Sequence, residues 1–406
     1  MTSVTGITSV TGMTSTTGMT SMITTTSASL AVLLSLAQDV PATPPAADSA
    51  PKPQAPAAPA APRSVPLPAS ASPVADAAGK AGIDGLVAAD ARPDLIIKGL
   101  EFAEGPTADA FGETYFCDLS GAAVYRVVRS ATGYRADRIV TASNGVAGLA
   151  FSRAGRLYGT QMFSGAIVEV ELFTDGTARL RNVIERIGGE ARPGCNDLVT
   201  TADGGIWWTN MGDRRKPNRR GIYFSTEAGG EPVQVASPLT QPNGIRLSPD
   251  GTSLYAVDYG APVVWKFPVL GPGKLGDGVP LASLAIVGDP AKVRGGDGMT
   301  VDSKGNLWVA VPLASAVVVF DPAGKPLGRV IVPEYPSNCA FGGADGKTLF
   351  ITARTGVYVL PTLVDGFWTA RGGQPAVQQP PAAEPPASIA APAAPPASPA
   401  APPTSK

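Results

Sequence analysis

The sequence predicts an all-β protein: a six-bladed β-propeller flanked by disordered Pro/Ala-rich segments at both ends. Six segments share one pattern, in which a turn glycine follows eight residues after the first residue of an expected strand, here called the register position. The turn glycines are 41 to 54 residues apart, a period typical of four-stranded propeller blades. A run rich in β-branched and aromatic residues follows every turn, which favours strands over helices. The turn glycines are Gly112, Gly155, Gly204, Gly251, Gly305 and Gly346.

The first 38 residues form a Ser/Thr-rich leader that ends in a short apolar run, Leu30–Ala37. Small residues near the end of this run resemble a secretory cleavage site, so we expect a secreted or periplasmic protein. No Lys or Arg precedes Lys52, and an uncleaved leader on a cytoplasmic protein is therefore the alternative. The run is too short to span a bilayer, so no membrane span is expected.

Two segments of low complexity, 39–93 and 372–406, consist mainly of Ala, Pro and Ser. They contain few large apolar side chains, and burial of so little surface cannot offset the entropy lost on ordering. We expect a flexible linker at 39–93 and a disordered tail at 372–406. The propeller domain is then 94–371.

Within this domain, the second strand of each blade is expected directly after its turn glycine. The sixth repeat offers one strand too few, whereas the apolar segment Asp94–Leu100 precedes the first repeat without a blade of its own. Pairing of these two parts removes an exposed sheet edge. The sequence thus predicts that the N-terminal strand completes the sixth blade. The expected second strands are Thr114–Cys117, Arg156–Gly159, Ile206–Thr209, Ser253–Val257, Leu307–Ala310 and Thr348–Thr352.

Composition excludes several classes of function. The formal net charge is −1 and only 16% of residues are charged, so no broad basic field is expected to attract nucleic acid or an anionic membrane. The chain has no histidine, which excludes His-based triads and dyads and zinc sites with His ligands. Cys117, Cys195 and Cys339 show no C-x-x-C spacing, and we interpret them as small buried thiols.

Oxygen-bearing side chains occupy five of the six register positions, although Asp, Glu and Asn make up only about a tenth of the chain. The first strand of each propeller blade lines the central channel, so these side chains should converge on the axis. A set of oxygen ligands without nitrogen or sulfur favours Ca²⁺, with Mg²⁺, Mn²⁺ or Zn²⁺ as further candidates. Each Asn–Gly or Asp–Gly pair taken alone would indicate a turn, and the shared register favours a metal site. The register positions are Glu104, Asn196, Asn243, Asp297 and Asn338, with Ala147 in the second repeat.

An ordered set of motifs resembles one known group: the calcium-dependent six-bladed propellers related to senescence marker protein, gluconolactonase and luciferin-regenerating enzyme. The resemblance covers nearly all of 94–362. The motifs are EGP at Glu104–Pro106, ND followed by an apolar residue at Asn196–Leu198, PNGI followed by SPDG across Pro242–Asp258, and DGM followed by GNLWVA across Asp297–Ala310.

This resemblance implies a lactonase acting on a small-molecule sugar lactone. Glu104, Asn243 and Asp297 would hold the divalent cation, Asn196 would be a further ligand or a substrate contact, and Asp297 would also act as general base. Some relatives carry an Arg two residues before the Asn, where this chain has Gly194.

Arg192 stands two residues further back than Gly194, and Arg192 and Asn338 are the other expected substrate contacts. An ester or phosphotriester hydrolase on the same site, or a non-catalytic calcium-stabilised binding module, are alternative functions. The sequence leaves the substrate, the metal and the oligomeric state open.

Overall fold

The computed structural model describes residues 82–131, 133–212, 219–236, 238–286, 294–371, 373 and 377–380. Contacts divide the chain into Met1–Ala58 and Pro59–Lys406, and the described residues all belong to the second unit. The leader at 1–38 with its run Leu30–Ala37, most of the linker and most of the tail lie outside them. Among the described residues, no helix is long and apolar enough to cross a membrane.

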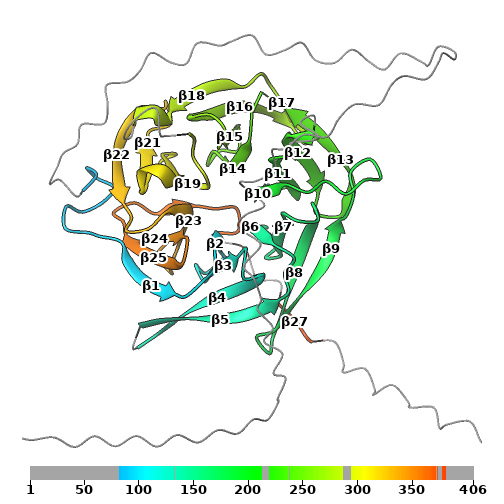
Figure 1. Cartoon of the computed structure of the whole chain (residues 1–406), viewed down its shortest axis with the longest axis horizontal. Helices are drawn as coiled ribbons and strands as arrows, with labels where there is room; N and C mark the ends of the chain where they lie inside the picture. Colours follow the sequence, from blue (N-terminus) through cyan, green and yellow to red (C-terminus); the bar gives the residue numbers. More distant parts are fainter. Residues whose placement is uncertain are drawn as a thin grey trace, which may run out of the picture. The chain divides into compact units, whose positions relative to one another are not determined.

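Six sheets surround a central channel, which confirms the predicted six-bladed propeller (Figure 1). Each blade is an antiparallel meander, and the innermost strands of neighbouring blades contact one another around the whole ring. Blade 1 contains β2 (Ala103–Ala108), β3 (Thr114–Asp118), β4 (Ala123–Ser130) and β5 (Gly133–Thr141). Blade 2 contains β6 (Val146–Phe151), β7 (Leu157–Gln161), β8 (Ile167–Phe173) and β9 (Ala178–Ile184). Blade 3 contains β10 (Cys195–Thr200), β11 (Gly205–Asn210), β12 (Gly221–Thr226) and β13 (Gly229–Ala236).

The second half of the ring follows the same plan with added short strands. Blade 4 contains β14 (Pro242–Leu247), β15 (Ser253–Asp258), β16 (Val263–Gly271), β17 (Lys274–Leu275) and β18 (Val279–Ser283), followed by the 3-10 helix η3 (Leu284–Ile286). Blade 5 contains β19 (Met299–Asp302), β20 (Leu307–Val311), the 3-10 helix η4 (Pro312–Ala314), β21 (Ala316–Phe320) and β22 (Pro326–Ile331). Blade 6 contains β23 (Pro336–Gly342), β24 (Thr348–Ala353), β25 (Gly356–Pro361) and β1 (Asp94–Lys98).

Strand β1 closes the ring, as predicted. It pairs antiparallel with β25, with Asp94 opposite Val359 and Lys98 opposite Gly356. The sixth blade therefore combines one strand from the start of the domain with three from its end, which leaves no unpaired strand between the first and last blades.

The ordered domain begins earlier than the predicted boundary at 94. Ile83, Leu86 and Val87 are buried and pack in the same cluster as Trp308 of blade 5. Backbone bonds from the amides of Leu86 and Val87 to the carbonyl of Ile83 form a tight turn, which places these few apolar side chains on one side. The assignment of all of 39–93 to a linker was wrong for this segment, because a few well-spaced apolar residues suffice to bury a turn.

Two short strands follow the last blade, and the second of them lies past the predicted boundary at 371. Strand β26 (Gly366–Phe367) pairs with β19 on the inner edge of blade 5. Strand β27 (Val377–Gln378) pairs parallel with the end of β8 in blade 2 (Figure 1). Part of the predicted tail therefore adds to the sheet of blade 2.

The three cysteines are free and buried, as predicted. Each thiol donates to a backbone carbonyl of a neighbouring blade: Cys117 to Ala147 at 2.9 Å, Cys195 to Gly165 at 3.3 Å and Cys339 to Trp308 at 3.4 Å. Burial raises the pKa of all three thiols. They therefore act as small neutral side chains that form hydrogen bonds between neighbouring blades.

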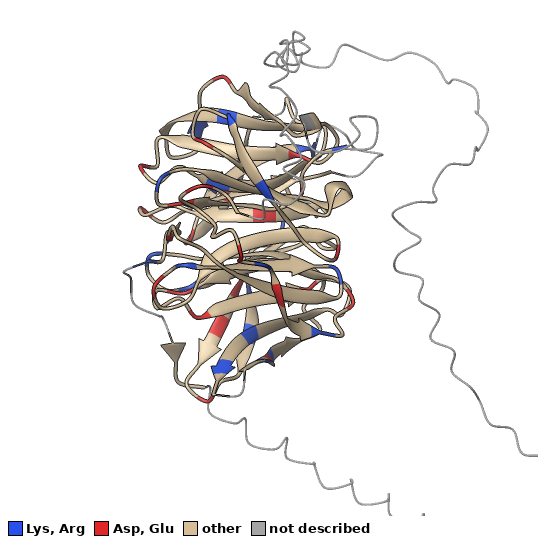
Figure 2. Ribbon diagram, turned by 90° about the vertical axis from the view of Figure 1, so that its left-hand side faces the viewer, with Lys and Arg blue, Asp and Glu red and all other residues tan. Residues whose placement is uncertain are grey.

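Charged residues of both signs are interspersed over the blades (Figure 2). On the outer strands of blade 2, for example, Arg181 pairs with Glu169 and Glu171. This distribution accords with the net charge of −1.

Candidate metal centre and catalytic site

The register positions coincide with irregularities in strand pairing. In five blades the pairing between the first and second strands shifts at or beside the register residue. Such bulges bend a strand and redirect its side chains, and they are common next to active sites. The shifts lie between Glu104 and Thr107, Val146 and Leu149, Cys195 and Leu198, Pro242 and Ile245, and Pro336 and Asn338.

In blade 5 the register residue also lies outside regular strand pairing, but without a bulge. Its inner strand β19 begins only at Met299, two residues after the register residue Asp297. The amide of Asp297 donates to the carbonyl of Ala310 at 2.8 Å, and the amide of Ala310 donates to the carbonyl of Gly298 at 2.9 Å. The backbone on both sides of the Asp297 carboxylate is thereby fixed.

Two glycines allow neighbouring register residues to approach closely. A Cβ atom on Gly244 would lie 2.6 Å from the carbonyl oxygen of Asp297. A Cβ atom on Gly298 would lie 1.8 Å from Cγ of Asn338. Any side chain at these positions would force blades 4, 5 and 6 apart. Glycine after Asn243 and after Asp297 therefore allows these blades to pack closely.

The register side chains are buried at one end of the channel, here called the mouth. The exposed fractions are 6% for Glu104, 8% for Asn196, 3% for Asn243, 7% for Asp297 and 2% for Asn338. Buried polar groups normally find partners, and unpaired ones cost free energy. The hydrogen bonds of these side chains therefore show which of their polar atoms are paired within the protein and which are available to a ligand.

Both amide atoms of the Asn338 side chain have hydrogen-bond partners in the protein. Its Oδ1 accepts from the amide of Cys339 at 2.8 Å, and its Nδ2 donates to Oε2 of Glu104 at 3.5 Å. The amide of Gly105 donates to the same carboxylate oxygen at 3.0 Å. These bonds orient the Glu104 carboxylate. The predicted contact of Asn338 with the substrate stays a prediction.

Asn243 shows the opposite pattern. Its side chain lies close enough to the carboxylate of Asp297 to lower the pKa of that group. Its Oδ1 atom is buried and has no hydrogen-bond partner among the described residues. A buried amide oxygen without a donor is costly, and a cation would satisfy it.

The two carboxylates of the ring, Glu104 and Asp297, disfavour each other's charge. Burial raises the pKa of Glu104 well above its usual range, and the charge of Asp297 adds to this rise. Burial also raises the pKa of Asp297, to about 8, while the neighbouring Asn243 side chain opposes the rise. A divalent cation between such carboxylates would favour their charged forms.

The ring fits a hard cation with few charged ligands. Among the described residues, no cluster of three or more His, Cys, Asp or Glu side chains could hold a metal. The candidate centre instead combines two carboxylates with the amide oxygens of Asn243 and Asn196. Asn196 donates through Nδ2 to Sδ of Met211 at 3.4 Å, which leaves its Oδ1 as the atom available to a cation.

Arg192 lies outside this ring. Its Nη1 donates to the hydroxyl of Tyr223 and its Nε to the carbonyl of Ile187, both at 3.2 Å. These bonds hold the segment that leads into β10. Its predicted contact with the substrate stays a prediction.

An ion pair that the sequence did not reveal lies beside the ring. Nη1 of Arg246 donates to Oδ2 of Asp197 at 2.9 Å, and the exposed fractions of the two side chains are 13% and 1%. Asp197 follows the register residue Asn196, and its charge contributes to the raised pKa values of Glu104 and Asp297. The signal available in the sequence was a single cation, Arg246, within the apolar inner strand PNGIRL.

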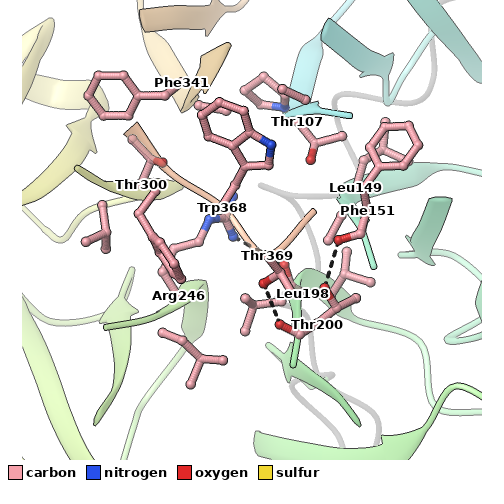
Figure 3. Close-up of a pocket in the computed structure, with 18 residues that line it drawn as sticks. Thr107, Leu149, Phe151, Leu198, Thr200, Arg246, Thr300, Phe341, Trp368 and Thr369 are labelled. Carbon is pink, nitrogen blue, oxygen red and sulfur yellow. Dashed lines mark hydrogen bonds between the residues drawn. The ribbon is translucent and has the colours of Figure 1, made fainter. Parts of the chain in front are cut away.

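The opposite end of the channel is closed by the chain itself. A pocket there is lined by residues of all six inner strands and by Phe367, Trp368 and Thr369 (Figure 3). Nε1 of Trp368 donates to the carbonyl of Asp109 at 2.9 Å, and Oγ1 of Thr369 donates to the carbonyl of Thr200 at 2.8 Å. We call Gly366–Arg371 the strap. The lining of the pocket beside the strap contains no carboxylate, whereas Glu104 and Asp297 lie at the mouth, which is therefore the candidate site.

Comparison with known proteins gives a match over most of the propeller. The family described as "SMP-30/Gluconolactonase/LRE-like region" matches residues 102–355. A gluconolactonase of Zymomonas mobilis subsp. mobilis is 28% identical over 232 residues, which cover 52% of this chain and 62% of that protein. The chain thus spans about three fifths of the length of this relative.

Solved structures agree with the fold. The structure of a gluconolactonase from Xanthomonas campestris is 28% identical, with a TM-score of 0.58, over 74% of this chain and 98% of that chain. A regucalcin from Agrobacterium tumefaciens, described as a calcium-binding protein, is 20% identical with a TM-score of 0.57, over 68% of this chain and 96% of that chain. The second likeness shows the propeller fold alone.

Proposed function

Because the chain belongs to the SMP-30/gluconolactonase/LRE-like family, we propose that it hydrolyses a sugar lactone at the mouth of the propeller channel. Similarity to the Zymomonas and Xanthomonas gluconolactonases supports this reaction class. The observation that carries the proposal is the buried Glu104–Asp297 pair beside the unpartnered Oδ1 of Asn243. Such a site has the ligands for a cation and a carboxylate able to accept a proton.

We propose Ca²⁺ as the cofactor, held by Glu104, Asn243 and Asp297 with Asn196 as a further ligand. The donor set consists of oxygen atoms, which Ca²⁺, Mg²⁺ and Mn²⁺ prefer. When bound, a divalent cation supplies polarisation of the lactone carbonyl and charge stabilisation for the developing oxyanion.

Asp297 is the proposed general base. Its carboxylate takes a proton from the attacking water while the water oxygen bonds to the carbonyl carbon. The ring C–O bond then breaks, and the ring oxygen takes up the proton that Asp297 accepted, which gives a hydroxy acid and restores the carboxylate. The backbone bonds to Ala310 and from Gly244 hold Asp297 in place for this task, at 2.8 and 3.1 Å.

Glu104 and the Asp197–Arg246 pair set the electrostatics around this base. Asn338 and the amide of Gly105 orient Glu104, so its carboxylate does not depend on solvent for its position. Arg246 balances the charge of Asp197, which limits the negative charge near Asp297 to what one divalent cation can offset.

A substrate panel tests the function. The purified protein should open D-glucono-1,5-lactone faster than the uncatalysed blank and should leave an organophosphate triester intact. Hydrolysis of the triester but not of the lactone would favour the alternative esterase function. Calcium binding without either activity would favour a non-catalytic binding module.

A further inference from the structure

Two tyrosine hydroxyls meet at the mouth beside the proposed base. The hydroxyls of Tyr259 in blade 4 and Tyr335 in blade 6 lie 3.2 Å apart. Tyr259 follows the end of β15, where Asp258 pairs with Pro242. Tyr335 directly precedes β23. The pair therefore links blades 4 and 6 across the part of blade 5 that carries Asp297.

Two further observations indicate that Asp297 lies near Tyr259 and Tyr335. A Cβ atom on Gly295 would lie 2.6 Å from the carbonyl oxygen of Tyr259, so the segment before Asp297 is pressed against Tyr259. Burial and the Tyr259 hydroxyl raise the pKa of Tyr335, and the charge of Asp297 adds to this rise. The two phenols thus lie near the reacting groups.

The equivalent position in other blades carries apolar side chains. Tyr259 donates its backbone amide to Gln241, and the residues that make the matching bond in blades 1, 2 and 3 are Leu119, Met162 and Met211. All four side chains are half-buried. At this position blades 1 to 3 therefore present apolar side chains, whereas blade 4 presents a hydroxyl group that meets the Tyr335 hydroxyl of blade 6.

The Tyr259–Tyr335 pair retains hydrogen-bonding capacity. One phenol donates to the other, which leaves one O–H donor and further acceptor lone pairs. No other hydrogen bond of either hydroxyl occurs among the described residues. Since both side chains are only half-buried, a ligand at the mouth can reach these groups.

We propose that Tyr259 and Tyr335 determine substrate specificity by hydrogen-bonding a ring hydroxyl of the lactone while its carbonyl faces Asp297. The inference rests on the proposed function for the substrate class. A site that hydrogen-bonds a substrate hydroxyl discriminates against an analogue that lacks it, because its own polar groups are then left unpaired. The protein should accordingly prefer polyhydroxylated lactones to unsubstituted ones of the same ring size.

The test compares Tyr259→Phe and Tyr335→Phe with two substrates, D-glucono-1,5-lactone and δ-valerolactone, which has the same ring without hydroxyls. Each variant should lower kcat/KM for the hydroxylated lactone about tenfold, through KM, and leave δ-valerolactone unchanged. Tyr134→Phe removes a hydroxyl from β5, the outer strand of blade 1, and is the matched control. An equal loss with both substrates, or no loss with either, would overturn the proposal.

A binding measurement separates this inference from the proposed function. Calorimetric titration with the non-hydrolysable D-gluconolactam and δ-valerolactam requires no turnover. If the wild-type protein opens no lactone, the proposed function fails, and weaker gluconolactam binding by the two variants still supports hydroxyl recognition. Unaltered gluconolactam binding by both variants, or no binding by the wild type, would overturn it.

Discussion

The two ends of the channel are formed by the same six inner strands and differ in how their polar groups are satisfied. At the mouth, Oδ1 of Asn243 is buried without a partner, and the pKa values of Glu104 and Asp297 are raised by burial. At the strap, Oγ1 of Thr200 donates to the carbonyl of Phe151, and its own carbonyl accepts from Thr369 (Figure 3). The mouth thus contains a buried polar atom without a hydrogen-bond partner, whereas the polar groups of Thr200 at the strap end are hydrogen-bonded.

This difference indicates that residues important for function and residues important for stability lie at opposite ends of the same inner strands. The bulges sit at the mouth end of the strands, and regular pairing resumes within a few residues, as at Thr107 opposite Tyr115. Changes at the mouth should therefore affect catalysis, and changes at the strap should affect stability. Four experiments test this separation.

The largest effect is expected from opening the ring, because both ends depend on its closure. A chain that begins at Glu101 lacks β1 and the buried residues Ile83, Leu86 and Val87. Compared with a chain that begins at Gly82, it should lose most of its cooperative thermal transition and its lactonase activity together. Equal melting temperatures for the two chains, measured by circular dichroism, would show that β1 is dispensable.

A change confined to the mouth should remove catalysis and leave the fold intact. Asp297→Asn keeps an oxygen that can reach a cation but cannot act as a base, so turnover should fall by about 10²–10⁴-fold while calcium still binds. Asn243→Asp keeps the shape of the side chain and should retain measurable turnover. Near wild-type turnover of Asp297→Asn at saturating calcium would exclude Asp297 as the base.

A change confined to the strap should have the reverse effect. Trp368→Ala removes a half-buried ring, its hydrogen bond to Asp109 and its contact with the Arg371 guanidinium, which lies 5.1 Å from the ring centre. We expect a loss of about 2 kcal/mol in the free energy of unfolding, measured in urea. The calcium affinity should stay within about twofold of the wild type, and a parallel loss of affinity would contradict the separation of the two ends.

The smallest effect concerns the pH dependence of the metal-free protein. A carboxyl whose folded pKa is raised contributes stability that is present below its usual pKa, near about 4, and that is lost as the pH rises through the folded value. For Asp297 that value is about 8, so chelator-treated protein should unfold at lower urea at pH 8 than at pH 6. Calcium should reduce the difference, and Asp297→Asn should show less of it. Identical midpoints in metal-free wild type would contradict the raised pKa.

The sequence predicted the ring because its signal is local. The spacing of eight residues between each register position and its turn glycine reflects one strand and one turn, and both recur in every blade. Closure by β1 followed from counting strands. The hydrogen-bond partners of Asn338 could not be predicted, because the register fixes where a side chain lies and not which of its amide atoms faces Cys339 or Glu104.

Contacts between distant segments account for what the sequence missed. The Asp197–Arg246 pair joins residues 49 positions apart in neighbouring blades, and no local pattern links them. The strap follows the last blade and returns to β19, where Phe367 pairs with Val301. Packing of this kind depends on the shape of the finished ring.

The central claim is that the mouth is a cation-dependent lactonase site, and returning calcium to metal-stripped protein tests it most directly. Initial rates of D-glucono-1,5-lactone opening would be measured against the uncatalysed blank as Ca²⁺ is added. The account predicts a rate at the blank level before addition and full activity near one equivalent of calcium per chain. Full activity in the stripped protein, unchanged by added calcium, would contradict it.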